Sequence, residues 1–272
     1  MIEVKNIQFK YRGQKTLVFD GFSLELAENR VYGLLGRNGT GKSTLLYLLS
    51  GLLRPAQGAV CIDGIDAYKR QPEMLREVFL VPEEFELPSL RLSKYVALYR
   101  PFYPHFSDEI LQKCLCDFEL SGDIHLKELS MGQKKKAFIA FAMATNTKYL
   151  LMDEPTNGLD IPSKGQFRKV VAQNMSDERI IIISTHQVHD VEQLLDHILI
   201  LDKRSLLLNA SVGDITEQYS FEYRPVNDGS PVVYAEPALQ GYATIAKRQE
   251  GDPETQLNLE LLFNYITSKK EA

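Results

Sequence analysis

Eight consecutive residues have the types and the spacing of a loop that binds nucleotide phosphates. Residues 36–43, GRNGTGKS, fit the pattern G-x-x-x-x-G-K-[ST] at every defined position. A short apolar run precedes them, and a helical pattern begins at Ser43. The glycines let backbone N–H groups curl around phosphate oxygens, and the helix dipole favours an anion. The sequence therefore predicts a nucleotide site, with Lys42 on the β- and γ-phosphates and the Ser43 hydroxyl on Mg²⁺.

A pair of carboxylates follows a second apolar run. Residues 150–152 are typical of a buried strand in a parallel sheet, and Asp153 and Glu154 come directly after it. Asp153 would then point toward the metal ion, usually through water. Glu154 can orient or deprotonate the water that attacks a γ-phosphate. Taken alone, the pair could be a solvated loop, but beside the phosphate loop it predicts hydrolysis of the nucleotide.

A third stretch, ELSMGQKKKA at residues 128–137, combines a predicted helix start with three lysines in a chain of net charge −5. With LSMGQ in view, the chain resembles the nucleotide-binding subunit of ABC transporters over residues 1 to about 208. P-loop kinases and GTPases lack this pentapeptide before the acidic strand. The resemblance implies that the pentapeptide faces the γ-phosphate of an ATP held by another subunit. Lys134 to Lys136 are then expected to be ordinary, partly solvated helix residues.

The resemblance implies further roles, residue by residue. Tyr11 matches the aromatic that stacks on adenine, His186 the switch histidine beside the γ-phosphate, and Asp160 a contact across the dimer interface. Without the resemblance these three could be a surface aromatic, a satisfied core histidine and a turn former. The implied site comprises catalytic Lys42, Glu154 and His186, nucleotide-binding Tyr11, Gly36, Arg37, Asn38, Gly39, Thr40, Gly41, Lys42, Ser43 and Thr44, signature Ser130, Met131, Gly132 and Gln133, and the Mg²⁺ ligands Ser43, Glu83 and Asp153.

Two positions depart from the family's pattern. Met131 stands where the commonest signature has a second glycine, a position that tolerates variation if the side chain points away from phosphate. Glu83 stands where the family usually has glutamine, so it can still ligate Mg²⁺ but adds negative charge near the γ-phosphate. This Pro-Glu-Glu loop and a terminal amphipathic helix at residues 259–263 are similar to those of ABC-2 type exporters. An importer subunit is the alternative within the family.

The order of the elements predicts an α/β fold. Strand patterns at residues 2–4 and 22–26, helical patterns over about residues 89–146, and apolar strands at residues 149–152 and 180–184 alternate along the chain. The resemblance implies a P-loop NTPase (RecA-like) core with an N-terminal antiparallel β subdomain, an inserted helical subdomain and a small α+β C-terminal extension. We expect the cassette to span residues 1–208 and an accessory segment residues 209–272, with a final helix capped by Asn258.

Composition narrows the possible functions. The mild acidity argues against a nucleic-acid binder with a basic surface. Three cysteines are too few for a disulfide framework, so Cys114 and Cys116 are expected to be buried thiols. Residues 1–9 have no apolar signal core, and the longest apolar runs are too short to span a bilayer.

These expectations combine into one hypothesis about location and partners. The chain would be a cytoplasmic ATPase that uses ATP and Mg²⁺, pairs with a second ATP-binding subunit as a homodimer, and lies on the inner face of the cell membrane through a separate integral permease. The resemblance implies that a permease helix docks in a groove beside residues 81–90, with Phe85 and Leu87. A heterodimer stays open, and a soluble ABC ATPase of translation or repair is the alternative of a different class.

Overall fold

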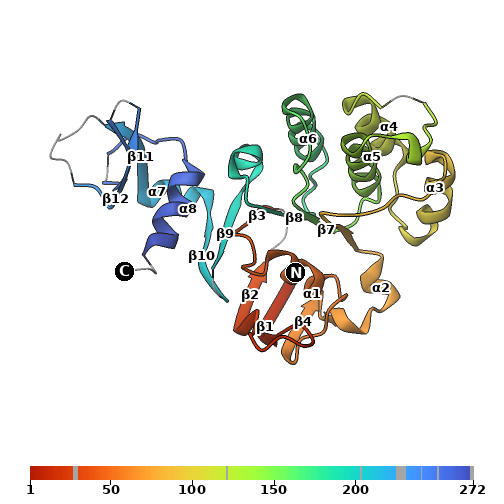
Figure 1. Ribbon diagram of the computed structural model, residues 1–272, viewed down its shortest axis with the longest axis horizontal. Coiled ribbons are helices and arrows are strands. Elements are labelled where there is room, and N and C mark those ends of the chain that lie inside the picture. Colours follow the sequence, from red (N-terminus) through yellow and green to blue (C-terminus); the bar gives the residue numbers. More distant parts are fainter. Residues whose placement is uncertain are drawn as a thin grey trace.

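A six-stranded sheet forms the centre of the molecule (Figure 1), with the strand order β10-β9-β3-β8-β7-β6. The computed structural model describes residues 1–26, 30–120, 122–202, 204–224, 231–239, 241–249 and 251–269. Neighbouring strands are parallel except β10, which runs antiparallel to β9. The strands are β3 (Arg30–Leu35), β6 (Val78–Val81), β7 (Tyr149–Asp153), β8 (Ile180–Thr185), β9 (His197–Asp202) and β10 (Ser205–Ser211).

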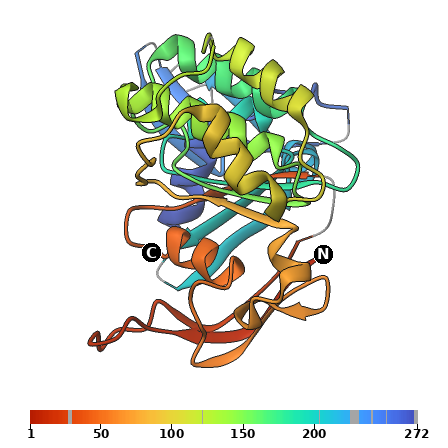
Figure 2. The ribbon, with the colours of Figure 1, turned by 90° about the vertical axis from the view of Figure 1, so that its right-hand side faces the viewer.

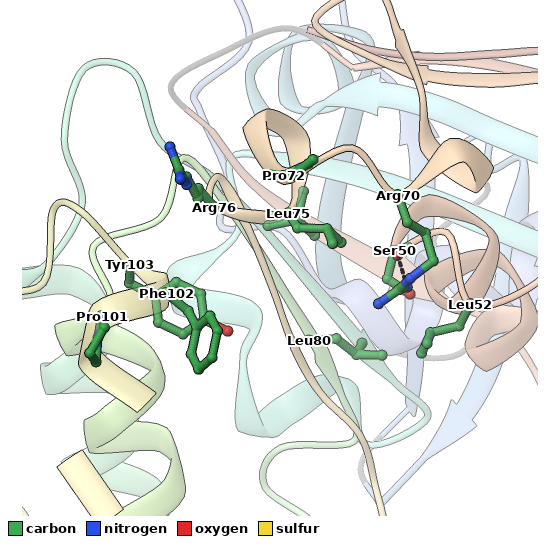
Figure 3. A pocket seen from close by; sticks show the side chains of 11 residues that line it. Ser50, Leu52, Arg70, Pro72, Leu75, Arg76, Leu80, Pro101, Phe102 and Tyr103 are labelled. Atoms are coloured by element: carbon green, nitrogen blue, oxygen red, sulfur yellow. Dashed lines mark hydrogen bonds between the residues drawn. The ribbon is translucent and has the colours of Figure 1, made fainter. Parts of the chain in front are cut away.

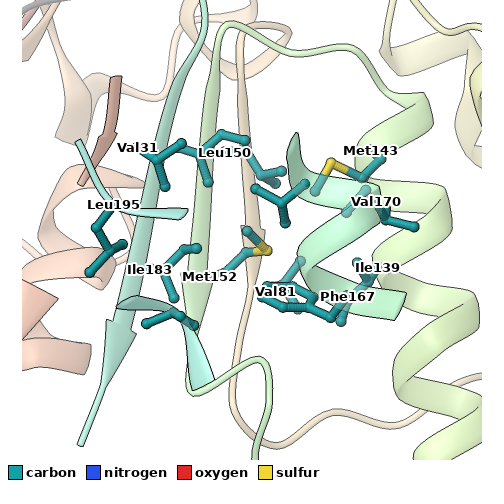
Figure 4. Close-up of a cluster of buried hydrophobic side chains, with 14 of the residues drawn as sticks. Val31, Val81, Ile139, Met143, Leu150, Met152, Phe167, Val170, Ile183 and Leu195 are labelled. Atoms are coloured by element: carbon teal, nitrogen blue, oxygen red, sulfur yellow. The ribbon is translucent and has the colours of Figure 1, made fainter. Parts of the chain in front are cut away.

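The central sheet is buried on both faces, which explains its unbroken apolar runs. Side chains alternate along each strand, so Val31 and Leu35 face one core while Tyr32 and Leu34 face the other. The first core lies under α5 (Met131–Ala144) and α6 (Ile161–Gln173), as Figure 4 shows. The second core is covered by α1 (Lys42–Leu49) and an antiparallel sheet.

The antiparallel sheet has the order β2-β1-β4-β5 and lies on the opposite side of the central sheet from the helical part (Figure 2). This confirms the predicted N-terminal β subdomain. Its strands are β1 (Ile2–Phe9), β2 (Phe19–Leu26), β4 (Gln57–Ile62) and β5 (Ile65–Asp66). The 3₁₀ turn η1 (Ala67–Lys69) and the short helix α2 (Pro72–Leu75) then lead into β6.

The segment between β6 and β7 is helical, as predicted. It contains α3 (Leu92–Tyr99), η2 (Arg100–Phe102), α4 (Asp108–Asp117), η3 (Leu126–Glu128) and α5. The aromatic ring of Phe141 on α5 packs against several other rings of this part, including those of Tyr95 and Phe106. Side chains cap the helix starts, with Ser107 at α4, Ser130 at α5 and Asp160 at α6.

A smaller α+β unit follows β10 at the C-terminal end. It contains α7 (Val212–Gln218), β11 (Tyr219–Arg224), β12 (Tyr234–Ala238), β13 (Gly241–Lys247) and α8 (Leu259–Ser268), with the strand order β11-β13-β12. Asn258 caps α8 as predicted, because its side chain accepts a hydrogen bond of 2.9 Å from the Leu261 N–H. The helix packs against η4 (Val188–Asp190), which joins this unit to the cassette.

The two neighbouring cysteines differ in exposure. Cys114 is buried, and burial raises the pKa of its thiol to about 11. Cys116 is exposed, so the prediction of a buried thiol is wrong there. The reason is helical geometry, since residues two apart on α4 do not share a face. Among the described residues no helix combines the length and apolarity needed to cross a membrane.

Candidate active site

A cavity of about 660 Å³ lies at the carboxyl ends of the central strands, around the start of α1. This is where open α/β sheets bind ligands. Its lining comes from segments that are far apart in the sequence. The lining residues are Tyr11, Gln14, Val18, Asn38, Gly39, Gly41, Lys42, Ser43, Thr44, Glu83, Glu154, Asn157 and His186.

The loop between β3 and α1 has the geometry that the glycine spacing predicts. Gly39 and Gly41 adopt φ values of 79° and 106°, which favour glycine. At Gly41 a Cβ atom would also come within 2.9 Å of Val18. The loop curls around the ammonium of Lys42, whose Nζ donates to the Gly36 carbonyl at 2.8 Å. The start of α1 and this lysine therefore face the cavity together.

Lys42 is a buried cation among carboxylates. Its Nζ lies 3.8 Å from Oε1 of Glu154. Burial lowers the pKa of Lys42, while the carboxylates of Glu154, Asp153 and Glu83 act in the opposite direction. The Lys42 side chain therefore lies where phosphate oxygens are expected.

The predicted magnesium ligands come from three elements. Asp153 ends β7 and is buried, and it accepts a hydrogen bond from the Ser184 hydroxyl of β8. Burial raises the pKa of Asp153, and hydrogen bonds from Ser184 and Ser43 counteract this. Mg²⁺ takes oxygen ligands and is usually held by one or two carboxylates together with substrate phosphates. Ser43, Asp153 and Glu83 supply a hydroxyl and two carboxylates, so the residues present fit this ion.

Glu154 has its backbone and its side chain fixed. Its φ of 44° lies in the left-handed region, which is uncommon for a residue other than glycine. The Thr185 hydroxyl donates to Oε2 at 3.1 Å, and Nδ1 of His186 lies 2.8 Å from Oε1. The carboxylate is 6% exposed and lines the cavity, so it can accept a proton from a water molecule there.

Tyr11 and Glu83 both lie at the cavity, as predicted. The Tyr11 hydroxyl is 2.9 Å from Oγ1 of Thr44, and its ring meets Phe9 edge-on. Glu83 Oε1 accepts a 2.9 Å hydrogen bond from the side-chain amide of Asn157. The sequence interpretation did not include Asn157, although its place between Glu154 and Asp160 in the loop after the acidic strand is a signal that could have identified it.

The signature residues lie at a helix start outside this cavity. Ser130 caps α5 by accepting from the Gln133 N–H at 3.3 Å, and Oε1 of Gln133 accepts from the Ser130 N–H at 3.0 Å. Met131 is 66% exposed. Among the described residues, Ser130 to Gln133 do not line the cavity around Lys42.

Two further residues, Asp160 and Lys135, make defined contacts near the starts of α6 and α5. Asp160 is exposed and caps α6, accepting from the Ser163 N–H at 2.9 Å. The prediction of partly solvated lysines after the signature is wrong for Lys135, which is 5% exposed. Its Nζ donates to the carbonyls of Glu154 and Asn157. The signal was present in the sequence, because Lys135 shares a helix face with the apolar residues Ile139 and Ala142.

The fold and the site define a P-loop ATPase, and the comparisons with known proteins make the class more specific. Residues 19–157 match the family model described as "ABC transporter". A methionine import ATP-binding protein of Carboxydothermus hydrogenoformans is 31% identical over 227 residues, covering 79% of this chain and 67% of that protein. A Nod factor export ATP-binding protein of Cupriavidus metallidurans is 28% identical over 243 residues, covering 84% and 80%.

A solved structure agrees with these relatives. The dimeric structure of a bacterial ABC transporter cassette superposes with a TM-score of 0.67 at 25% identity, covering 78% of this chain and 99% of that one. The chain belongs to the ABC transporter family and is an ABC transporter ATPase. The resemblance drawn from its motifs is confirmed at this level.

Proposed function

We propose that two copies of this chain close around two ATP molecules and thereby drive a separate membrane permease. One observation carries the proposal: the signature at the start of α5 is exposed and does not line the chain's own nucleotide cavity. A cavity bordered by Lys42 and Glu154 in one subunit would be completed by Ser130 and Gly132 of the other. The dimeric relative supports this arrangement.

The surface beside the signature supports an interface between subunits. Met131 and Ile161, the first residues of α5 and α6, are 66% and 85% exposed. Each is a large apolar side chain exposed to solvent at a helix start, as we expect for residues that become covered on dimerisation. Asp160, which directly precedes Ile161, is also exposed, and we propose that it is a dimer contact.

The proposed chemistry is positioning and charge neutralisation, as in phosphoryl transfer generally. Lys42 and the N–H groups at the start of α1 would bind the phosphates, and Tyr11 would stack on adenine. His186 would donate to the γ-phosphate, and Glu154, fixed by Thr185 and His186, would take the proton of the attacking water. Ser43, Asp153 and Glu83 would hold Mg²⁺, which neutralises phosphate charge.

Two observations bear on the direction of transport. The Pro82-Glu83-Glu84 loop and the similarity to a Nod factor export protein favour export. The similarity to a methionine import protein keeps an importer subunit as the second candidate. Export is our proposal, and identification of the permease, for example from the neighbouring reading frame, would decide between the two.

We propose that the permease docks in an apolar cavity of about 500 Å³ between α2, the end of α1 and η2 (Figure 3). Leu75, Leu80 and Phe102 point into it, and Arg70 and Arg76 lie at its rim. This surface fits a short amphipathic helix with acidic flanks. The predicted position on Phe85 and Leu87 is less suitable, because the Phe85 ring packs at a tilt against Phe138 and Leu87 packs against the chain's own core.

This docking site can be tested by membrane fractionation in the cells that encode the chain. Phe102 is 64% exposed inside the cavity, and Leu98 is 54% exposed outside its lining. We expect Phe102→Glu to reduce the membrane-bound fraction at least about fivefold, as for an interface anchor, whereas Leu98→Glu retains it. The ATPase activity of both purified variants should stay near that of the wild type. Unchanged membrane binding of Phe102→Glu would contradict the proposed docking site. Association of the wild-type chain with ribosomes or DNA would instead favour a soluble ABC ATPase of translation or repair.

A further inference from the structure

The middle lysine of the run after the signature has an environment unlike that of its neighbours. Lys135 is buried, whereas Lys134 and Lys136 are half-buried. Burying an ammonium group is costly unless it is hydrogen-bonded. Its Nζ donates to the Glu154 carbonyl at 3.1 Å and to the Asn157 carbonyl at 2.8 Å. The signature helix is thus attached by one side chain to the loop that carries the proposed catalytic glutamate.

One of the charges around Lys135 is that of Glu83, where the family usually has glutamine. Burial lowers the pKa of Lys135, and the carboxylates of Glu83, then Glu154 and Asp153, oppose that effect. The same three carboxylates oppose the effect of burial on Lys42. The site therefore sets three anions against two buried lysines. Replacing Lys135 by a neutral residue would remove one of these two buried cations and leave Lys42 beside the same three carboxylates.

Asn157 connects the two ends of this arrangement. Its side-chain amide donates to Glu83 Oε1 at 2.9 Å, and its carbonyl accepts from Lys135. Glu83, Asn157 and Lys135 consequently form a continuous chain of contacts from the loop after β6 to the first half of α5. Ser130, the N-cap of the same helix, precedes Lys135 by about one and a half turns.

We propose that Lys135 is a positioning residue that balances the charge of Glu83 and ties the signature helix to the catalytic loop of its own chain. Movement of α5 when Ser130 binds the partner's ATP then reaches Glu154 and Glu83 through one ammonium group. Lys135 thereby couples the two ATP sites of the dimer. This inference rests on the proposed dimer and deepens it.

A double-mutant cycle on the full-length chain tests the inference. The variants are Lys135→Met, Lys135→Gln, Glu83→Gln, the double variant Glu83→Gln/Lys135→Met, and the control Lys134→Met. For each we would measure kcat, KM and the Hill coefficient for ATP hydrolysis, together with the midpoint of thermal unfolding. The midpoint of thermal unfolding separates a positioning role from a purely structural one. Replacing a buried charge by an apolar side chain need not destabilise the fold, so a loss of activity at an unchanged midpoint indicates positioning.

We expect Lys135→Met to lower kcat about tenfold or more with KM within about threefold, and Lys134→Met to stay within about twofold of the wild type. The fold-loss in kcat of the double variant should be at least about threefold smaller than the product of the fold-losses of the two single variants, as expected for residues that interact. The Hill coefficient of Lys135→Met should fall toward that of independent sites. Lys135→Gln removes the charge but keeps a side-chain donor, so its kcat should fall below that of the wild type by no more than that of Lys135→Met. It replaces Lys135→Met if the methionine variant does not fold.

Wild-type kcat in Lys135→Met or Lys135→Gln would overturn the inference. If the fold-loss in kcat of the double variant equals the product of the two single fold-losses, Lys135 does not act through Glu83 and that part of the inference is overturned. Neither result affects the proposed dimer, which is tested separately by substitution of Ser130.

Discussion

At the residue scale, the central feature is a carboxylate held in one position. Glu154 combines a left-handed backbone with hydrogen bonds to Oε1 and Oε2 from the end of β8. Its backbone N–H also donates to the Ser184 carbonyl at 3.0 Å. A side chain fixed in this way costs no reorganisation when the reaction begins. The adjacent residue Asp153 interacts with Ser43 and Ser184 instead, so the two neighbouring carboxylates have different hydrogen-bond partners.

The signature serine provides a prediction at this scale. Ser130→Arg replaces a helix cap outside the chain's own cavity, at a cost of about 1 kcal/mol in folding free energy. We expect ATP hydrolysis to fall at least about 100-fold, because the guanidinium would prevent closure on the partner's ATP. The ATP affinity of the monomer, measured by calorimetry at low protein concentration, should stay within about twofold. A large loss of monomer affinity would instead indicate that the signature acts on the chain's own ATP.

Sequence patterns could locate most of the cavity residues but not the contacts between them. Residues of the phosphate loop, Glu154 and His186 line the same cavity, because parallel strands bring their carboxyl ends to one edge of the sheet. Asn157 was missed because an amide in a loop has no periodic pattern, and its position between Glu154 and Asp160 was the signal available. Lys135 was predicted to be solvated because three adjacent lysines look alike in sequence, and only the helix face distinguishes the middle one.

At the element scale, a buried arginine joins the far ends of two functional helices. Arg179 is 1% exposed and donates to the carbonyl of Asn174, the C-cap of α6, at 3.0 Å, and to that of Met143 in the last turn of α5 at 3.4 Å. Burial lowers its pKa to about 10, so it stays cationic at neutral pH. Helix C-termini carry partial negative charge, which favours this cation. Arg179 therefore connects the C-terminal ends of α5 and α6, the helices whose N-terminal ends carry the signature and Asp160.

Arg179→Ala should lower the free energy of unfolding by about 2–4 kcal/mol, because it opens a cavity and leaves buried carbonyls without a donor. The measurement is equilibrium denaturation by urea. Arg76→Ala, at an exposed position, is the matched control and should change stability by about 0.5 kcal/mol or less. Equal transition midpoints for the two variants would contradict the role assigned to Arg179.

The elements were predictable where periodicity was long or burial complete. Helices over residues 89–146 and strands β3, β7 and β8 lie where the patterns indicate. β10 crosses the predicted boundary at residue 208 while pairing with β9, so hydrogen-bond pairing between strands carries information that a change in composition does not.

At the scale of the whole molecule, the C-terminal unit is attached close to His186. The start of α8 is bound by Glu192 of η5 (Glu192–Leu194), whose Oε1 accepts from the Leu259 N–H at 2.8 Å. His189, three residues after His186, has its Nε2 2.6 Å from Oε2 of Glu260. The division into a cassette over residues 1–208 and an accessory segment stays a proposal, but these contacts give it a defined position beside the active site.

The central claim is that the catalytic site is completed by a second chain that binds with ATP. The most direct test is the molar mass of Glu154→Gln, measured by light scattering with and without ATP and Mg²⁺, alongside its rate of hydrolysis. Without its base, the variant should retain ATP, hydrolyse it at least about 100-fold more slowly than the wild type, and accumulate as a dimer only when ATP is present. Near-normal turnover, or a mass that does not change with ATP, would contradict the account.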